Sequence, residues 1–231
     1  MRDAAFFRWL ESRQSSRPVV SLDQLISESG GASSFALVVV DLIKGFCSEG
    51  PLASAQVGEL VEPTVQLLER CHREGVEGFY FPCDAHPADS PEFRSFPPHC
   101  RIGTSESELA QPLSSLPFAA GFRRYDKGSV SAVVGTDLAA DLKDQSYRTL
   151  VCCGDCTDLC LYHLAVGLRF YANQHRLDWR IVVPANLVAT YDLGVEQALA
   201  VGAMPHPGPL LHDLFLYHLE LNGVEVVAAL E

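Results

Sequence analysis

The chain has 231 residues and a mass of 25.2 kDa, which fits one large domain. Its 17 Lys and Arg residues against 29 Asp and Glu residues give a formal net charge of −12, which disfavours binding to nucleic acid or to an anionic membrane. Hydrophobic residues make up 48% and charged residues 20%, a composition that excludes a disordered chain. No secretory leader or membrane-spanning run stands out, so we expect a cytoplasmic protein whose eight cysteines stay reduced.

Residues 1–34 are predicted to form an N-terminal helical extension. Apolar residues within positions 6–10 and again within positions 20–26 recur with helical spacing. Ser29, Gly30 and Gly31 then end the segment with turn chemistry. We find no linker further along, so residues 35–231 are expected to form a single domain.

Strands and helices are predicted to alternate through that domain. The continuous apolar run at 35–40 is typical of a strand buried on both faces of a parallel sheet. The proline-rich stretch 83–117 predicts a loop. Further strands are expected at 76–82, 149–153, 180–184 and 224–228, and helices at 57–74, 138–144, 156–173 and 195–203. This alternation predicts an α/β fold of the Rossmann-like kind, a three-layer αβα sandwich with a mostly parallel central sheet.

Polar residues follow the predicted strands at the edge where ligands bind in such a fold. Asp41 comes directly after the first strand, where partial desolvation raises a carboxyl pKa and favours a proton acceptor, although it could instead cap a loop. Asp84 and His86 follow the second strand, and His99 lies further along the loop. Two imidazoles and a carboxylate suit Zn²⁺, Fe²⁺ or Mn²⁺, whereas a polar surface loop is the alternative.

The third strand is followed by a cysteine-rich turn. Cys160 is predicted at the start of a helix, where the dipole and free amides lower a thiol pKa and stabilise an oxyanion, unless it is simply a small buried residue. Cys153 and Cys156 form a C-x-x-C, which leaves a redox or zinc function open, but no second C-x-x-C completes a zinc ribbon. Lys127 could lower the thiol pKa and orient a base, or lie in solvent.

Taken together, these motifs resemble those of the isochorismatase-like cysteine hydrolases, and within that superfamily the nicotinamidases. The sequence GDCTDLC at 154–160 resembles the family's G-x-x-T-D-x-C turn. The stretch from Asp84-Ala85-His86-Pro87 to Gly103-Thr104, with Pro97-Pro98-His99-Cys100 inside it, resembles the nicotinamidase metal loop. The resemblance covers about residues 35–228 and leaves the N-terminal segment unexplained.

The resemblance implies roles for the residues that match. Cys160 would be the nucleophile, Asp41 the general base and Lys127 the third member of a catalytic triad. The backbone amides of Cys156 and Cys160 would form the oxyanion hole, beside a cis peptide bond at Asp155–Cys156. The remaining matched residues would bind metal or substrate: Asp84, His86 and His99, with Glu92 as a further carboxylate, for a divalent transition metal, and Phe46 and Phe96 for a pyridine ring.

The resemblance implies metal-dependent hydrolysis of a small-molecule amide, and nicotinamide is the expected substrate. Zn²⁺ is the first expectation for the metal. The expected assembly is a homo-oligomer. The sequence departs from the family pattern at Ile43, Gly45, Asp155 and Leu164, which bears on substrate choice. One alternative is a related hydrolase that acts on another small amide or on isochorismate, although the presence of Cys160 argues against isochorismate. The other alternative is a non-catalytic binding or thiol-redox module.

Overall fold

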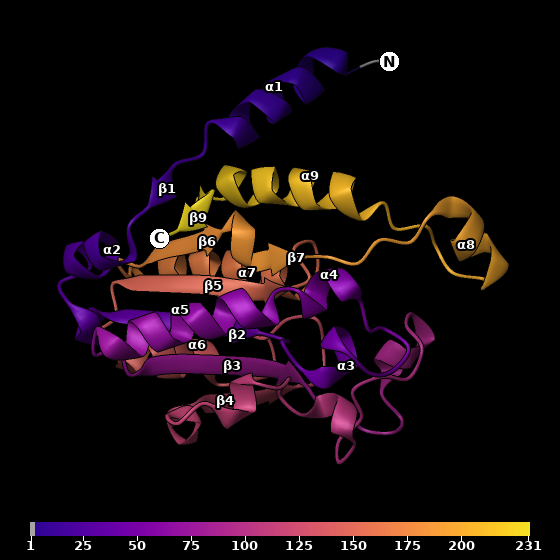
Figure 1. Cartoon of the computed structure of the whole chain (residues 1–231), viewed down its shortest axis with the longest axis horizontal. Helices are drawn as coiled ribbons and strands as arrows, with labels where there is room; N and C mark the ends of the chain where they lie inside the picture. The colour runs from indigo at the N-terminus through magenta and orange to yellow at the C-terminus, as the bar shows by residue number, and fades with distance from the viewer. Residues whose placement is uncertain (1–2) are drawn as a thin grey trace.

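The computed structural model describes residues 3–231, and its centre is a parallel sheet (Figure 1). The strands lie in the order β4-β3-β2-β5-β6-β8, with β7 paired to β5, and every pairing is parallel. The predicted α/β fold is therefore confirmed. The strands are β2 (Phe35–Val40), β3 (Gly78–Asp84), β4 (Arg123–Lys127), β5 (Thr149–Asp155), β6 (Arg180–Pro184), β7 (Val188–Ala189) and β8 (Glu225–Val227).

Strand β2 shows why the sheet is covered on both faces. Successive side chains of a strand point to opposite faces, so its apolar run contributes to two cores at once. Phe35, Leu37 and Val39 pack into one cluster, and the residues between them into the other. The first cluster is covered by α2 (Leu22–Glu28) and α5 (Val61–Arg73), and the second by α6 (Leu138–Asp144), α7 (Cys160–His175) and α9 (Gly208–Leu221).

Two elements differ from the sequence prediction. Strand β4 was not expected because it reads Arg-Arg-Tyr-Asp-Lys, and as an edge strand it leaves most of these side chains at least partly exposed. Helix α9 was not expected because its apolar residues are distributed around the helix, and only Gly208, Leu216 and Leu219 are buried. The predicted helix at 57–74 is divided into α4 (Ala55–Gly58) and α5.

The N-terminal segment forms the predicted helices α1 (Ala4–Ser15) and α2. The Trp9 ring packs edge-on against Tyr217 of α9 at 5.5 Å between ring centroids. Between the helices, β1 (Val19–Val20) pairs with β9 (Ala229–Leu230) near the end of the chain. Leu22 and Leu25 of α2 are fully buried in the first core cluster, and the division of the chain at residue 34 stays a prediction. Within residues 3–231, no helix has the length and apolar character needed to cross a membrane.

Candidate active site

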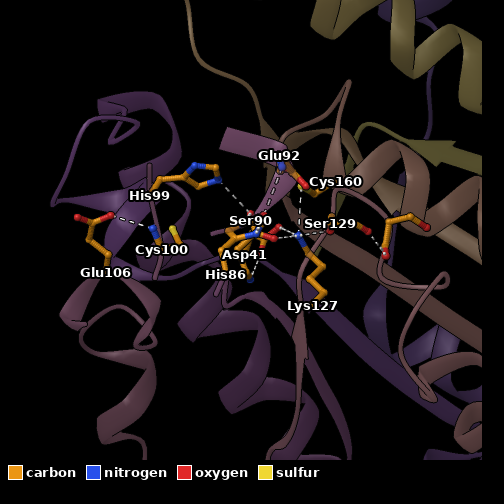
Figure 2. Close-up of polar contacts among 12 residues, drawn as sticks. Asp41, His86, Ser90, Glu92, His99, Cys100, Glu106, Lys127, Ser129 and Cys160 are labelled. Atoms are coloured by element: carbon orange, nitrogen blue, oxygen red, sulfur yellow. Dashed lines mark hydrogen bonds and ion pairs between the residues drawn. The ribbon is translucent and has the colours of Figure 1, made fainter. Parts of the chain in front are cut away.

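The predicted site residues meet at the carboxyl edge of the central sheet (Figure 2). Asp41 follows β2, Asp84 ends β3 and Lys127 ends β4. Because these strands are parallel neighbours, their last residues lie side by side, and Asp84 is in register with Lys127. Cys160 begins α7, which follows β5 on the other side of β2. The topology thus brings together residues that are up to 119 positions apart, from 41 to 160.

Lys127 lies at the centre of the predicted catalytic residues. Its Nζ is 2.7 Å from Asp41 Oδ2, donates a hydrogen bond to Asp84 Oδ1, and lies 3.4 Å from Cys160 Sγ. All four side chains are buried. Although burial disfavours a charged amine, the nearby Asp41, Cys160 and Asp84 raise the pKa of Lys127 well above its ordinary value. The lysine is therefore a permanent cation that compensates two buried carboxylates.

Asp41 is held in a position suited to a proton acceptor. Its backbone is left-handed, with φ 57°, a conformation that is uncommon for non-glycine residues and recurs at active sites. Its Oδ1 accepts a hydrogen bond from the backbone N–H of Asp84 at 2.7 Å. Burial raises the pKa of Asp41 to about 6, against the opposing effect of Lys127. One ligand atom each of Asp41, Asp84 and Cys160 lie within 4.8 Å of one another, so the carboxylate is near the thiol.

Cys160 is the first residue of α7, as predicted, but its thiol is not activated in the resting site. Burial raises the pKa of Cys160 well above its ordinary value, and the opposing charge of Lys127 does not reverse the shift. The lowering expected from the helix start is therefore wrong, because burial raises the pKa of the thiol more than the Lys127 charge lowers it. Asp41 is the nearby carboxylate that could accept the thiol proton.

The turn before Cys160 has the expected backbone. The peptide bond between Asp155 and Cys156 is cis. Among the turn, loop and cap hydrogen bonds of residues 3–231, none is donated by the backbone N–H of Cys156 or of Cys160. Both N–H groups are therefore available to an oxyanion. Cys153 lies within β5 and is buried in the first core cluster, and all eight cysteines are free thiols.

Asp84, His86 and His99 form a buried cluster with the geometry of a metal site. His86 Nε2 and His99 Nε2 lie 3.3 and 3.6 Å from Asp84 Oδ2. His99 Nδ1 donates to the carbonyl of Pro97 at 2.8 Å, which leaves its Nε2 lone pair directed at the cluster. His86 Nε2 is fully buried and has no hydrogen-bond partner among residues 3–231. A divalent transition metal would satisfy this orphaned nitrogen, so the residues fit such an ion.

The other predicted residues surround this cluster. Phe46 and Phe96 have ring centroids 5.7 and 6.2 Å from that of His99. Glu92 is half-buried outside the three-residue cluster, and burial and the Asp84 charge raise its pKa. The ring centroid of Phe93 lies 5.5 Å from that of His86. Phe93 was not predicted as a site residue, although its position next to Glu92 could have indicated it.

A cavity of about 390 Å³ opens beside these residues. It lies between the metal-cluster loop, the turn after Lys127, and the first turn of α7. His163, which lies one helical turn after Cys160 on α7, lines the cavity. The volume is in the range of small-ligand sites. The lining residues are Glu92, Ser95, Phe96, Ser129, Val130, Ser131 and His163.

Comparison with known proteins gives consistent matches. Residues 35–229 match the isochorismatase domain family. The chain is 34% identical to Nicotinamidase 1 of Arabidopsis thaliana over 213 aligned residues. This alignment covers 85% of this chain and 86% of the plant protein. The crystal structure of nicotinamidase PncA from Bacillus subtilis aligns with a TM-score of 0.64 and 27% identity, over 84% of this chain and 99% of that one. N-carbamoylsarcosine amidase from Thermoplasma acidophilum aligns with a TM-score of 0.61 and 26% identity, over 84% and 95%.

Proposed function

Since this chain belongs to the isochorismatase family, we propose that it is a metal-dependent cysteine hydrolase that converts nicotinamide to nicotinate and ammonia. Its family and its likeness to nicotinamidases make it an amide hydrolase. The observation that carries the finer proposal is the contact of Lys127 with Asp41, Asp84 and Cys160, directly beside the histidine cluster. A nucleophile, a base and a candidate ligand set thus share one buried site.

The proposed reaction has two halves. Asp41 takes the thiol proton while Cys160 Sγ attacks the amide carbon, and the amides of Cys156 and Cys160 stabilise the oxyanion. The carbon–nitrogen bond then breaks, Asp41 returns the proton to the leaving nitrogen, and ammonia and a Cys160 thioester are formed. Asp41 then takes a proton from water as its oxygen attacks the thioester carbon, the carbon–sulfur bond breaks, and Asp41 returns that proton to Cys160 Sγ, which releases the acid as nicotinate and a solvent proton.

The metal would be held by Asp84, His86 and His99, with Zn²⁺ as our first choice and Fe²⁺ or Mn²⁺ as alternatives, because nitrogen and oxygen ligands suit all three. When bound, it would supply a positive centre that fixes the pyridine nitrogen of the substrate. Glu92 remains a proposed further carboxylate near this ion, half-buried at the cavity. Phe46 and Phe96 are proposed to enclose the ring. The assembly is still expected to be a homo-oligomer.

Hydrolysis of a different small amide is the second candidate, and Asp155 favours it. The family pattern has an aliphatic residue at this position, whereas Asp155 is 1% exposed and its Oδ1 has no hydrogen-bond partner among residues 3–231. The likeness to N-carbamoylsarcosine amidase supports amide chemistry on this fold with another substrate. A polar substrate group that bonded this oxygen would account for the departure.

Ammonia release from nicotinamide tests the proposal. Wild-type protein should release ammonia, and Cys160→Ala should reduce the rate to background. Cys71→Ala is the matched control, since this buried thiol lies in α5, which carries none of the proposed catalytic or metal-binding residues. Full activity in Cys160→Ala contradicts the mechanism. If nicotinamide stays intact while a panel of other small amides is hydrolysed, the second candidate replaces the first.

A further inference from the structure

The segment that carries the nucleophile has little regular structure of its own. Residues 156–159 join β5 to α7, and Leu159, which precedes the helix, provides no side-chain cap. Within the segment, the amides of Leu159 and Leu161 donate to the carbonyl of Cys156 at 3.0 and 3.1 Å. The position of Cys160 therefore depends on what holds this segment from outside.

Asp158 is held from outside by two side chains. Thr190 Oγ1 donates to Asp158 Oδ1 at 2.6 Å, and His206 Nε2 lies 2.8 Å from Asp158 Oδ2. The carboxylate is buried, and a buried carboxylate is stable only when its oxygens are paired. These two contacts therefore fix the nucleophile segment to residues that follow β7.

His206 is itself held by side-chain and backbone contacts. Its Nδ1 lies 2.8 Å from the carbonyl oxygen of Tyr191, and its ring stacks on that of Tyr191 with centroids 3.7 Å apart. Its backbone exchanges two hydrogen bonds with Leu193, at 2.8 and 2.9 Å. Both ring nitrogens face oxygen atoms at 2.8 Å, so the ring is fixed between the Tyr191 carbonyl and the Asp158 carboxyl group. The residue closes the base of the excursion 194–205, which carries α8 (Val195–Ala200) away from the sheet (Figure 1).

We propose that His206 is a positioning residue for amide hydrolysis, because through Asp158 it fixes the segment that directs the Cys160 thiol at Lys127. The effect on turnover rests on the proposed function. Thr157 provides a separate attachment, since its N–H donates to the Ala189 carbonyl and its Oγ1 lies 2.9 Å from a ring nitrogen of His212. Loss of His206 should therefore displace the segment without releasing it.

Four variants test this proposal. His206→Ala and Asp158→Ala remove the pair from either side. Asp158→Asn is the conservative variant, because its amide N–H can donate to the Nε2 lone pair of a neutral His206 while Nδ1 still donates to Tyr191. His175→Ala is the matched control, an exposed histidine at the end of α7. We would measure kcat and KM with nicotinamide, and amide hydrogen exchange by mass spectrometry.

We expect His206→Ala and Asp158→Ala to lower kcat by about 10- to 100-fold with little change in KM, as a small misplacement of a reacting atom does. Exchange should accelerate in peptides covering 156–161 and not in β2. Asp158→Asn should keep most of the activity, and His175→Ala all of it.

Two results overturn the proposal. One is a His206→Ala variant that matches His175→Ala in kcat and in exchange at 156–161. The other is an equal acceleration of exchange in β2, which would mean general destabilisation. If the wild type leaves nicotinamide intact, the proposed substrate fails, and exchange in the same variants still decides whether His206 orders the nucleophile segment.

Discussion

Lys127 is the cation on which the buried acidic cluster depends, and removing its charge tests that dependence. Its side chain is 0% exposed, and it pairs with Asp41 and Asp84, whose side chains are 0% and 2% exposed. Lys127→Met keeps the apolar stem and most of the volume. Both carboxylates then lose their counter-ion in a place that water does not reach, and neither can be ionised without cost.

We expect Lys127→Met to lower the free energy of unfolding by about 3–5 kcal/mol, the cost of removing one partner from a buried ion pair. In a chain of this size each kcal/mol changes Tm by about 2–4 °C, so Tm should fall by roughly 6–20 °C. Because Lys127 pairs with two carboxylates, Asp41 and Asp84, we expect a loss of stability in the upper part of the roughly 3–5 kcal/mol range. Turnover should be lost as well, because Lys127 contacts the nucleophile and the base.

Urea unfolding in the presence of a metal chelator measures this change without a contribution from a bound ion. Lys143→Met removes the same charge from an exposed position on α6 and should stay within about 0.5 kcal/mol of the wild type. Adding Asp41→Asn to Lys127→Met should restore part of the stability, since one uncompensated carboxylate disappears. The reasoning is refuted if Lys127→Met unfolds at the same urea concentration as Lys143→Met, or if Asp41→Asn destabilises it further.

Three more changes have defined outcomes. Gly154→Ala should lower the free energy of unfolding by roughly 2–6 kcal/mol, from backbone strain and overpacking together. The φ of Gly154 is +113°, and a Cβ there would lie 2.0 Å from the Val40 carbonyl oxygen. An unchanged urea midpoint contradicts this prediction. His99→Ala should weaken Zn²⁺ binding by at least the roughly 10- to 100-fold that loss of an orienting partner causes, as measured by chelator competition, and equal affinity would exclude His99 as a ligand. Asp155→Asn should gain stability relative to the wild type as pH rises above the usual Asp range. Burial raises the pKa of Asp155, so the folded wild type keeps a proton that its unfolded form has already lost, and while it does so the gain is about 1.4 kcal/mol per pH unit; a gain that falls with pH would show an ionised Asp155.

The sequence predicted those parts of the site that follow directly from strand ends. Asp41 and Asp84 come after apolar runs, and parallel strands bring their carboxyl ends to one edge, so the pattern alone indicates that they are neighbours. For Lys127 the residues alone left two possibilities open, a partner of the thiol and a solvated lysine, and only the family resemblance made it the third member of a triad. Its strand is polar and lies at the edge of the sheet, so no hydrophobic period marks it.

The properties that burial decides were not predictable from spacing. A helix start indicates a lowered thiol pKa, but the extent of desolvation depends on the packing of distant elements, and at Cys160 desolvation outweighs the lowering effect of the Lys127 charge. The same limit applies to His206, which lies 48 positions from Asp158 and reaches it only through the excursion after β7. Because burial raises the pKa of the Cys160 thiol and its segment is held from that distance, the proposed mechanism depends on Asp41 at the moment of attack more than on a preformed thiolate. In that mechanism, reactivity is set by how accurately the fold holds Asp41 and Cys160 together, and a helix start alone does not provide it.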